Sequence, residues 1–106
     1  MTVELRRITA DDVHVFDNIA DDVFDEPIHA GRLAAYLVEP SHLLMLAIDN
    51  GLVVSQCAAV IHRHPDKVNE LYIDEVGTAT SHLRQGIARR LMDAMFDWGR
   101  QLGCEE

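Results

Sequence analysis

The sequence predicts an α/β fold in which a mostly antiparallel mixed sheet is flanked by helices. Three observations support this prediction. Residues 3–8 have the pattern of a strand and precede two stretches with helical periodicity. Two apolar runs and a third strand-like segment follow between residues 43 and 76, and residues 86–102 form one long amphipathic stretch. The chain has 106 residues, 48% hydrophobic and 25% charged, which fits one globular domain over residues 1–106.

The first part of the chain is expected to supply one strand and two helices. Residues 3–8 form the strand, and Thr9 suits the N-cap position because Asp12 follows three residues later. The helix after Thr9 should turn one apolar face to the sheet, made of Val13, Phe16, Ile19, Ala20, Val23 and Phe24. Pro27 ends this helix, and a second helix is expected over residues 29–38.

A three-stranded antiparallel meander is predicted between residues 43 and 76. Asn50 and Gly51 separate its first two strands, and this pair is the strongest short hairpin signal because both turn positions need a positive φ. A break around Pro65 precedes the third strand, at residues 70–76.

An amphipathic helix is expected over residues 86–102. Its apolar positions recur at the helical period: Ile87, Leu91, Ala94, Met95, Trp98 and Leu102. Within this helix Gly99 lowers the stability of the helix by about 1 kcal/mol relative to Ala. Gly103 suits the left-handed position that ends a helix.

Charge is distributed unevenly along the chain, whose formal net charge is −9. Residues 1–49 carry ten acidic and three basic side chains, whereas residues 50–106 carry eight and six. This balance argues against a nucleic-acid partner, and it favours the second half for an anionic ligand and the first half for a cationic one. The seven acids between Ala10 and Glu26 are either a solvated helix face or a field that attracts a cation.

Other features of the sequence narrow the class of protein further. No apolar run approaches the roughly 18 residues of a membrane span, and residues 1–7 lack a signal-peptide pattern, so we expect a cytoplasmic protein without a membrane partner. Cys57 and Cys104 are too few for a disulfide framework, and neither has a fixed His partner that would make it a nucleophile. Cys57 lies in an apolar strand and is expected in the core, whereas Cys104 is expected at the fraying end of the chain. His62 and His64 share one strand face, but without a third ligand nearby an exposed loop is favoured and no metal site is predicted.

The segment best suited to chemistry joins the last strand to the last helix. The first turn of a helix presents unpaired N–H groups and the positive end of its dipole. Gly86 removes the Cβ that would keep a phosphate from this turn, and Arg84, Arg89 and Arg90 lie close by in sequence. These features indicate a pyrophosphate cradle. The alternative is a turn glycine followed by an ordinary amphipathic helix.

Residues 83–88 resemble motif A of the GNAT family of N-acetyltransferases, which reads Arg/Gln-x-x-Gly-x-Gly/Ala and binds the pyrophosphate of coenzyme A. Gly86 and Ala88 match its last two positions, whereas Leu83 stands where Arg or Gln is expected; any residue still supplies the backbone N–H. The order of predicted elements also matches the family, and residues 70–88 look most like its aminoglycoside 3-N-acetyltransferase branch. The resemblance implies acetyl transfer from acetyl-coenzyme A to a primary amine of a small molecule, such as an aminoglycoside.

The resemblance also implies roles for residues. Cofactor contacts are expected from Val76, Gly77, Thr78, Arg84, Gln85, Gly86, Ile87, Ala88 and Arg89. Val76 and Thr78 would bind the pantetheine amides through their backbone, as an added strand does. Glu75 is the candidate catalytic base for an ammonium group, and a solvated carboxylate at a strand end is the alternative. Asp74 is expected on the opposite face of the strand, and Glu70 is a further candidate for polarising water.

In the family a fifth strand, a helix and two more strands follow the cofactor helix, and the general acid, commonly a tyrosine, lies in that part. No residue up to Glu106 is assigned this role, so the chain is expected to be an N-terminal fragment or a naturally truncated member. The strand at residues 70–76 would then be an open sheet edge, which predicts a homodimer. The alternative to an enzyme is a non-catalytic coenzyme A-binding or self-associating module, or an inactive fragment.

Overall fold

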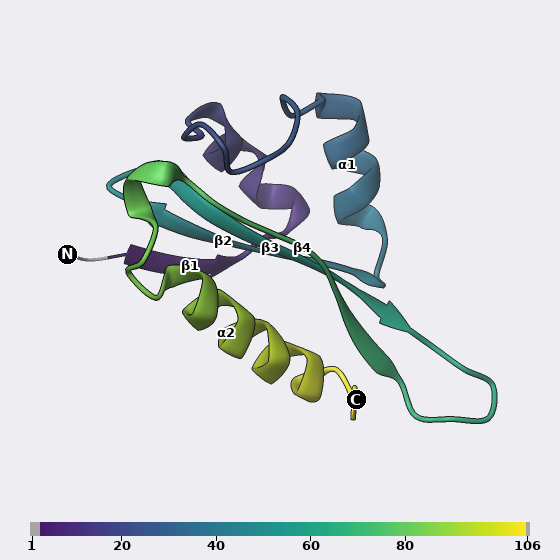
Figure 1. Ribbon diagram of the computed structural model, residues 1–106. Helices are drawn as coiled ribbons and strands as arrows, with labels where there is room; N and C mark the ends of the chain where they lie inside the picture. The colour runs from purple at the N-terminus through teal and green to yellow at the C-terminus, as the bar shows by residue number, and fades with distance from the viewer. Residues whose placement is uncertain (1–2, 106) are drawn as a thin grey trace.

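The computed structural model describes residues 3–105 and has one four-stranded antiparallel sheet between two helical layers (Figure 1), so the predicted α/β class is confirmed. The strands follow chain order across the sheet: β1 (Val3–Arg7), β2 (His42–Asp49), β3 (Leu52–His62) and β4 (Glu70–Thr78). The helices are the 3₁₀ helix η1 (Ala10–Asp17), α1 (Ala30–Val38), the short 3₁₀ turn η2 (Thr80–His82) and α2 (Ile87–Gln101).

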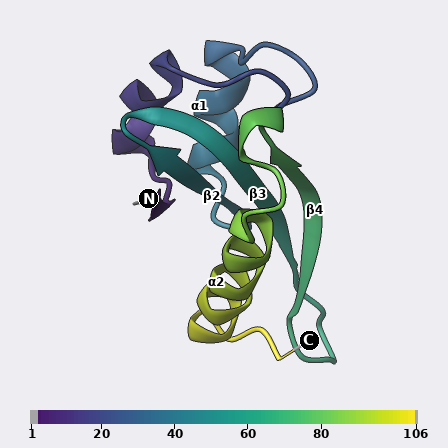
Figure 2. The ribbon, with the colours of Figure 1, turned by 60° about the vertical axis from the view of Figure 1, so that its left-hand side comes forward.

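Helices cover both faces of the sheet. η1 and α1 lie on one face and α2 on the other, as the turned view in Figure 2 also shows. The central strand β2 is therefore buried at every position from Leu43 to Ile48, which explains its continuous apolar run. α2 places Ile87, Leu91 and Met95 against the sheet at four-residue intervals. Leu102, expected on the same stripe, is 44% exposed, because the helix ends one residue earlier.

The predicted N-cap at Thr9 is confirmed. The backbone N–H of Thr9 donates to Asp12 Oδ2 at 2.8 Å, and Thr9 Oγ1 accepts from the N–H of Asp11 at 3.2 Å. The expectation of one helix continuing to Phe24 is wrong, because η1 is 3₁₀ and ends at Asp17. The residues after Asp17 form backbone hydrogen bonds with β3 and not with one another.

That pairing is centred on Ile19. The carbonyl of Asn18 accepts from the N–H of Val53, and the N–H of Ala20 donates to the carbonyl of Val53, both at 2.9 Å. A backbone that bonds to a strand has no donors left for a continuing helix. The chain then crosses the sheet irregularly and buries Val23, which is 2% exposed.

The two predicted turns are confirmed. Asn50 and Gly51 have φ of 52° and 82°, so both central hairpin positions are left-handed. Gly103 has φ of 90° at the end of α2, where Cys104 N–H donates to the carbonyl of Gly99 at 2.9 Å. Gly99 also allows α2 to approach β4 closely, because a Cβ there would lie 2.8 Å from Leu71 Cδ2.

Cys57 is buried in β3, as expected for a core thiol. Cys104 was expected at a frayed end, and this is wrong: it is only 5% exposed and forms a parallel bridge with Asn69. Apart from this bridge and a bond from Glu105 N–H to the carbonyl of Asn69, no described residue pairs with the outer edge of β4. Pairing of that edge with a second copy stays a prediction.

None of the helices within residues 3–105 has both the length and the apolar character that crossing a membrane requires.

Gly77 is required where the segment around Val23 crosses β4. A Cβ at Gly77 would lie 2.2 Å from the carbonyl oxygen of Val23, which is backbone and has little freedom to move. We predict that Gly77→Ala lowers the free energy of unfolding by about 1–3 kcal/mol, the usual cost of overpacking. Urea unfolding measures it.

The matched control is Gly31→Ala, whose added methyl meets only the His29 ring, at 3.1 Å, in a helix where Ala is favoured. We expect a smaller effect from this variant. An equal loss in both variants would contradict the close crossing at Gly77.

Candidate cofactor and acceptor site

The junction between β4 and α2 is held in place by hydrogen bonds to other parts of the chain. Ser55 Oγ donates to the carbonyl of Gly77 at 2.9 Å, and the N–H of Ala79 donates to the carbonyl of Val54 at 2.8 Å. In and beside η2, Thr80 Oγ1 donates to a carboxylate oxygen of Asp22, and His82 Nε2 pairs with Asp49 Oδ2, both at 2.8 Å. The end of β4 and the start of α2 are therefore positioned by the sheet.

The start of α2 fits an anionic group. Gly86 is the N-cap with φ of 75°, and a Cβ added there would meet nothing within 4 Å. No side chain within residues 3–105 caps this helix, so the N–H groups of its first turn are left for a ligand. Arg84 is also left-handed, with φ of 63°.

The predicted cofactor residues contribute to the start of α2 in two ways. Arg84, Gln85 and Arg89 are exposed around it, whereas the Ile87 side chain is buried under α2, so that Ile87 offers only its N–H. Because Gly86 lacks a side chain and its surroundings are open, the observed backbone satisfies the chemistry of a pyrophosphate cradle.

The middle of β4 carries a bulge that changes the predicted orientation of its acids. Glu75 pairs with Ala58 and Ile73 pairs with Ala59, which leaves Asp74 as an extra residue. The bulge interrupts the alternation of side chains. The expectation that Asp74 and Glu75 point to opposite faces is therefore wrong, and both side chains line the same cavity.

That cavity has a volume of about 420 Å³ and lies between α1, the loop before it and the sheet. Its lining is mainly apolar, with acidic and basic groups at its border: Phe16, Phe24, Glu26, Pro27, Ile28, His29, Arg32, Leu33, Tyr36, Leu44, Gln56, Ala58, Asp74 and Glu75. Three carboxylates against one guanidinium give the cavity a net negative character. An apolar hollow with a few charged groups is typical of a small-molecule site.

Gln56 connects the cavity to the rest of the fold. It lies on β3 and its side chain is completely buried. Its Nε2 donates to Glu75 Oε1 at 2.6 Å and to the carbonyl of Val23 at 3.3 Å. One amide therefore fixes both the carboxylate of Glu75 and the segment that closes one side of the cavity.

Tyr36 is a cavity residue that the sequence reasoning missed. Its hydroxyl donates to the carbonyl of Leu43 at 2.9 Å, and its ring stacks on His42 with centroids 4.5 Å apart. Burial, followed by the nearby Asp74 carboxylate, raises the pKa of Tyr36 to about 12, so the phenol stays protonated. Its place on α1, one turn after Leu33, was visible in the sequence, but the phenol's contact with the sheet was not.

Glu70 lies at the other end of β4 from Glu75, and the structure does not bring it to the cavity. It accepts a hydrogen bond from His64, which lowers the pKa of the Glu70 carboxyl. Glu70, the further candidate for polarising water, is therefore not placed to do so at this cavity.

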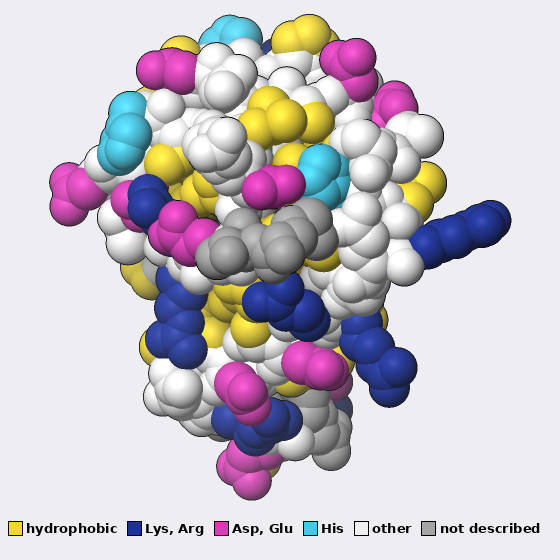
Figure 3. Space-filling model, turned by 90° about the vertical axis from the view of Figure 1, so that its left-hand side faces the viewer, with side chains coloured by type: hydrophobic (Ala, Val, Ile, Leu, Met, Phe, Trp, Pro, Cys, Tyr) yellow, Lys and Arg dark blue, Asp and Glu magenta, His cyan; other side chains and the backbone are white. Residues whose placement is uncertain are grey.

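Charge is separated between the two layers. On the face shown in Figure 3, most Lys and Arg side chains lie at or below the middle, at the height of α2. Most acidic side chains on this face lie above it, at the height of η1 and α1. The positive layer contains the cradle and the negative layer contains the cavity, as the charge imbalance along the sequence predicts.

The model of the acetyltransferase (GNAT) family matches residues 6–106, nearly the whole chain. The chain therefore belongs to the GNAT acetyltransferase family, whose members use acetyl-coenzyme A. This membership confirms the predicted family, and the observed order of elements agrees with the predicted one. No curated protein matches the chain significantly.

Solved structures show the same fold. An aminoglycoside acetyltransferase from an uncultured soil metagenomic sample superposes with a TM-score of 0.82 at 18% identity, over 99% of this chain and 76% of that one. A second, from the same kind of source and in complex with sisomicin, has a TM-score of 0.79 at 19% identity, over 98% and 74%. The structure of AAC(6')-Iy in complex with the bisubstrate analogue CoA-S-monomethyl-acetylneamine has a TM-score of 0.79 at 18% identity, over 100% and 77%.

The buried amide of Gln56 gives a direct test of this geometry. Gln56→Glu places a buried carboxylate against Glu75 and the carbonyl of Val23, and both interactions are repulsive. We predict a loss of about 1–3 kcal/mol in the free energy of unfolding at pH 7. Burial and the neighbouring charge disfavour the ionised form of the new carboxyl, so the loss should shrink as the pH falls towards 5 and the group takes up a proton.

Urea unfolding at several pH values measures this difference. Gln56→Leu is the uncharged control, and its loss should not depend on pH in the same way. A pH-independent loss for Gln56→Glu would contradict the close approach of Gln56 and Glu75.

Proposed function

We propose that this chain is an N-acetyltransferase that binds acetyl-coenzyme A across the β4–α2 junction and acetylates a primary amine of a small, polycationic molecule in the cavity beside α1. The single observation behind this proposal is that one strand carries two features. The bulged, acidic middle of β4 lines the cavity, and the end of the same strand leads through η2 into the open, left-handed start of α2.

The cofactor proposal assigns the pyrophosphate to the first turn of α2. The N–H groups from Gly86 to Arg89 would donate to phosphate oxygens, and the exposed guanidinium groups of Arg84 and Arg89 would add charge. The open backbone edge at Val76 to Thr78 would bind the pantetheine amides. When bound, acetyl-coenzyme A supplies the activated acyl group.

Glu75 is the proposed base. Gln56 holds one of its carboxylate oxygens, so the side chain has a defined position at the cavity and next to the strand edge. Glu75 would accept a proton from the acceptor ammonium, directly or through water, and so free the nitrogen lone pair for attack. Asp74 lies in the same cavity and would attract the cationic acceptor there.

The acceptor class follows from charge and volume. A cavity of about 420 Å³ bordered by Glu26, Asp74 and Glu75 suits part of a polyamine or an aminosugar better than a protein chain. The ten acids in residues 1–49 would extend this attraction beyond the cavity. Two of the similar structures hold sisomicin and a bisubstrate analogue that contains acetylneamine, which supports an aminoglycoside as the acceptor.

Coenzyme A binding tests the cradle. Gly86→Val combines β-branched strain at φ of 75° with methyl groups in the space where the phosphate would lie. We predict that calorimetry finds coenzyme A binding by the wild type and none by the variant.

Gly103→Val is the matched control, because Gly103 also has a positive φ and open space around it but lies at the opposite end of α2. It should lose stability and keep its affinity for coenzyme A. Equal affinity of the wild type and Gly86→Val would refute the cradle.

Acetyl transfer tests the acceptor class. We predict thiol release from acetyl-coenzyme A with aminoglycosides or polyamines, at a rate that falls as salt screens the acidic cavity. Glu75→Gln should lower this rate roughly 100-fold or more, the range of a lost general base. Asp17→Asn removes an acid outside the cavity and should change the rate only slightly, and less still at high salt.

Activity on peptide N-termini or lysines alone would defeat the small-amine proposal and leave the transferase reaction intact. Binding of coenzyme A without acetylation of any amine would favour the non-catalytic coenzyme A-binding module instead.

A further inference from the structure

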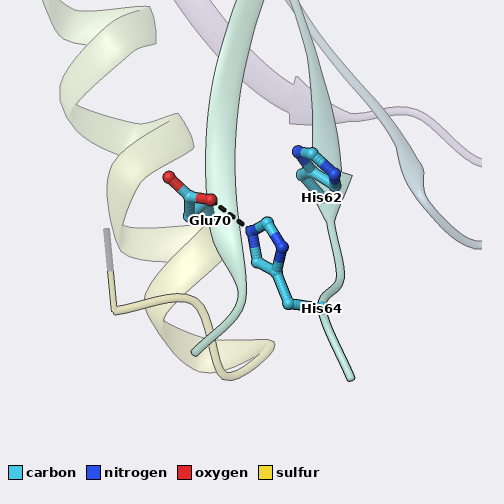
Figure 4. Close-up of side chains that lie close together, drawn as sticks. All are labelled: His62, His64 and Glu70. Atoms are coloured by element: carbon cyan, nitrogen blue, oxygen red, sulfur yellow. Dashed lines mark hydrogen bonds and ion pairs between the residues drawn. The ribbon is translucent and has the colours of Figure 1, made fainter. Parts of the chain in front are cut away.

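A group of metal-ligating side chains lies at the far end of the β3–β4 hairpin, away from the proposed cofactor and acceptor sites. His62 ends β3, His64 follows in the loop, and Glu70 begins β4 directly opposite His62. Figure 4 shows the three side chains gathered between the two chain segments. One ligand atom from each lies within 4.8 Å of the others.

We propose that His62, His64 and Glu70 form a binding site for a divalent transition-metal ion of the zinc class. Two imidazoles and one carboxylate are a ligand set that Zn²⁺ prefers, with bonds of about 2.0–2.2 Å. Tetrahedral ligands at such lengths lie about 3.3 Å apart, so small side-chain rotations would bring these atoms to a shared ion. The inference is independent of the proposed acetyl transfer.

The contacts around the three residues orient them for this role. His64 Nε2 is hydrogen-bonded to Glu70 Oε1, and the His62 and His64 ring centroids are 4.4 Å apart. Tyr72 supports the group from β4, because its hydroxyl lies 3.5 Å from Glu70 Oε2 and its ring centroid is 5.7 Å from that of His62. An outer residue that holds a ligating carboxylate in this way is a usual part of a metal site.

The ion would connect the end of β3 to the start of β4 and so close the loop at residues 63–69. Asn69, next to Glu70, forms the parallel bridge with Cys104, so this end of the molecule also holds the chain after α2. Three protein ligands leave one tetrahedral position for water or another ligand. The site would thus add a metal cross-link to the backbone pairing and the His64–Glu70 hydrogen bond that already join the segments.

Calorimetry with ZnCl₂ on the full chain, in a buffer that does not chelate metal, tests this inference. We expect one ion per chain and a rise in melting temperature that grows with the free Zn²⁺ concentration. His64→Ala and Glu70→Gln should each weaken binding roughly tenfold or more. Co²⁺ should give the visible absorption of tetrahedral coordination in the wild type, and weaker absorption in both variants.

Two controls keep the result specific. His14→Ala removes an exposed imidazole on η1, and Cys104→Ser removes the thiol nearest this end of the sheet; neither should change the affinity for Zn²⁺. Circular dichroism of each variant shows that it is folded, and Glu70→Gln preserves side-chain shape. Unchanged affinity in folded His64→Ala and Glu70→Gln, or loss of binding in Cys104→Ser alone, would overturn the proposal.

Discussion

The hydrogen bonds of one buried side-chain amide hold the segment around Val23 against the sheet. Gln56 lies fully buried on β3 and donates both to Glu75 on β4 and to the carbonyl of Val23 in the crossing segment. A buried amide without partners would cost several kcal/mol, so these bonds constrain the loop and the strand together. The crossing also requires Gly77, where there is no room for a Cβ under the Val23 carbonyl. The acidic cavity exists because this segment is held over the end of β4.

The same strand connects the two parts of the proposed chemistry. β4 has its bulge at Asp74, which turns two carboxylates into the cavity, and a few residues later the chain enters the turn before α2. Hydrogen bonds from Ser55, Thr80 and His82 fix this turn against β3, the crossing segment and β2. A cofactor held at the start of α2 and along the strand edge would therefore have its reactive end near Glu75. Positioning of two reactants by one rigid strand is the main contribution that such a fold makes to catalysis.

Local patterns predicted the elements well, since their signals depend on neighbouring residues only. The Thr9 cap, the Asn50–Gly51 turn and Gly103 all have the predicted conformations. The helix expected to reach Phe24 failed because Ile19 pairs with Val53, a contact between residues far apart in sequence that overrides helical periodicity. The family match confirms the predicted family, while the motif at Gly86 and Ala88 and the individual cofactor contacts stay predictions.

The site itself was only partly predictable. Alternation along a strand places Asp74 opposite Glu75, and only the register against β3 shows the bulge that brings them together. The role of Gln56 depends on partners 19 and 33 residues away in sequence. The role of Tyr36 depends on a partner seven residues away. Likewise, His62 and His64 gain their third potential ligand, Glu70, from the pairing of β3 with β4. Contacts of this kind follow from the tertiary fold rather than from local sequence.

The most direct measurement of the central claim is a titration of ¹⁵N-labelled protein with coenzyme A, followed by the amide signals in two-dimensional NMR. We expect the largest shifts on the amides of residues 84–89, with further shifts at residues 76–78 along the edge of β4. Amides of the hairpin at residues 63–69 and of the turn at Gly103 should move little. Shifts that cluster in those distant turns, with residues 84–89 unmoved, would contradict a cofactor site at the start of α2.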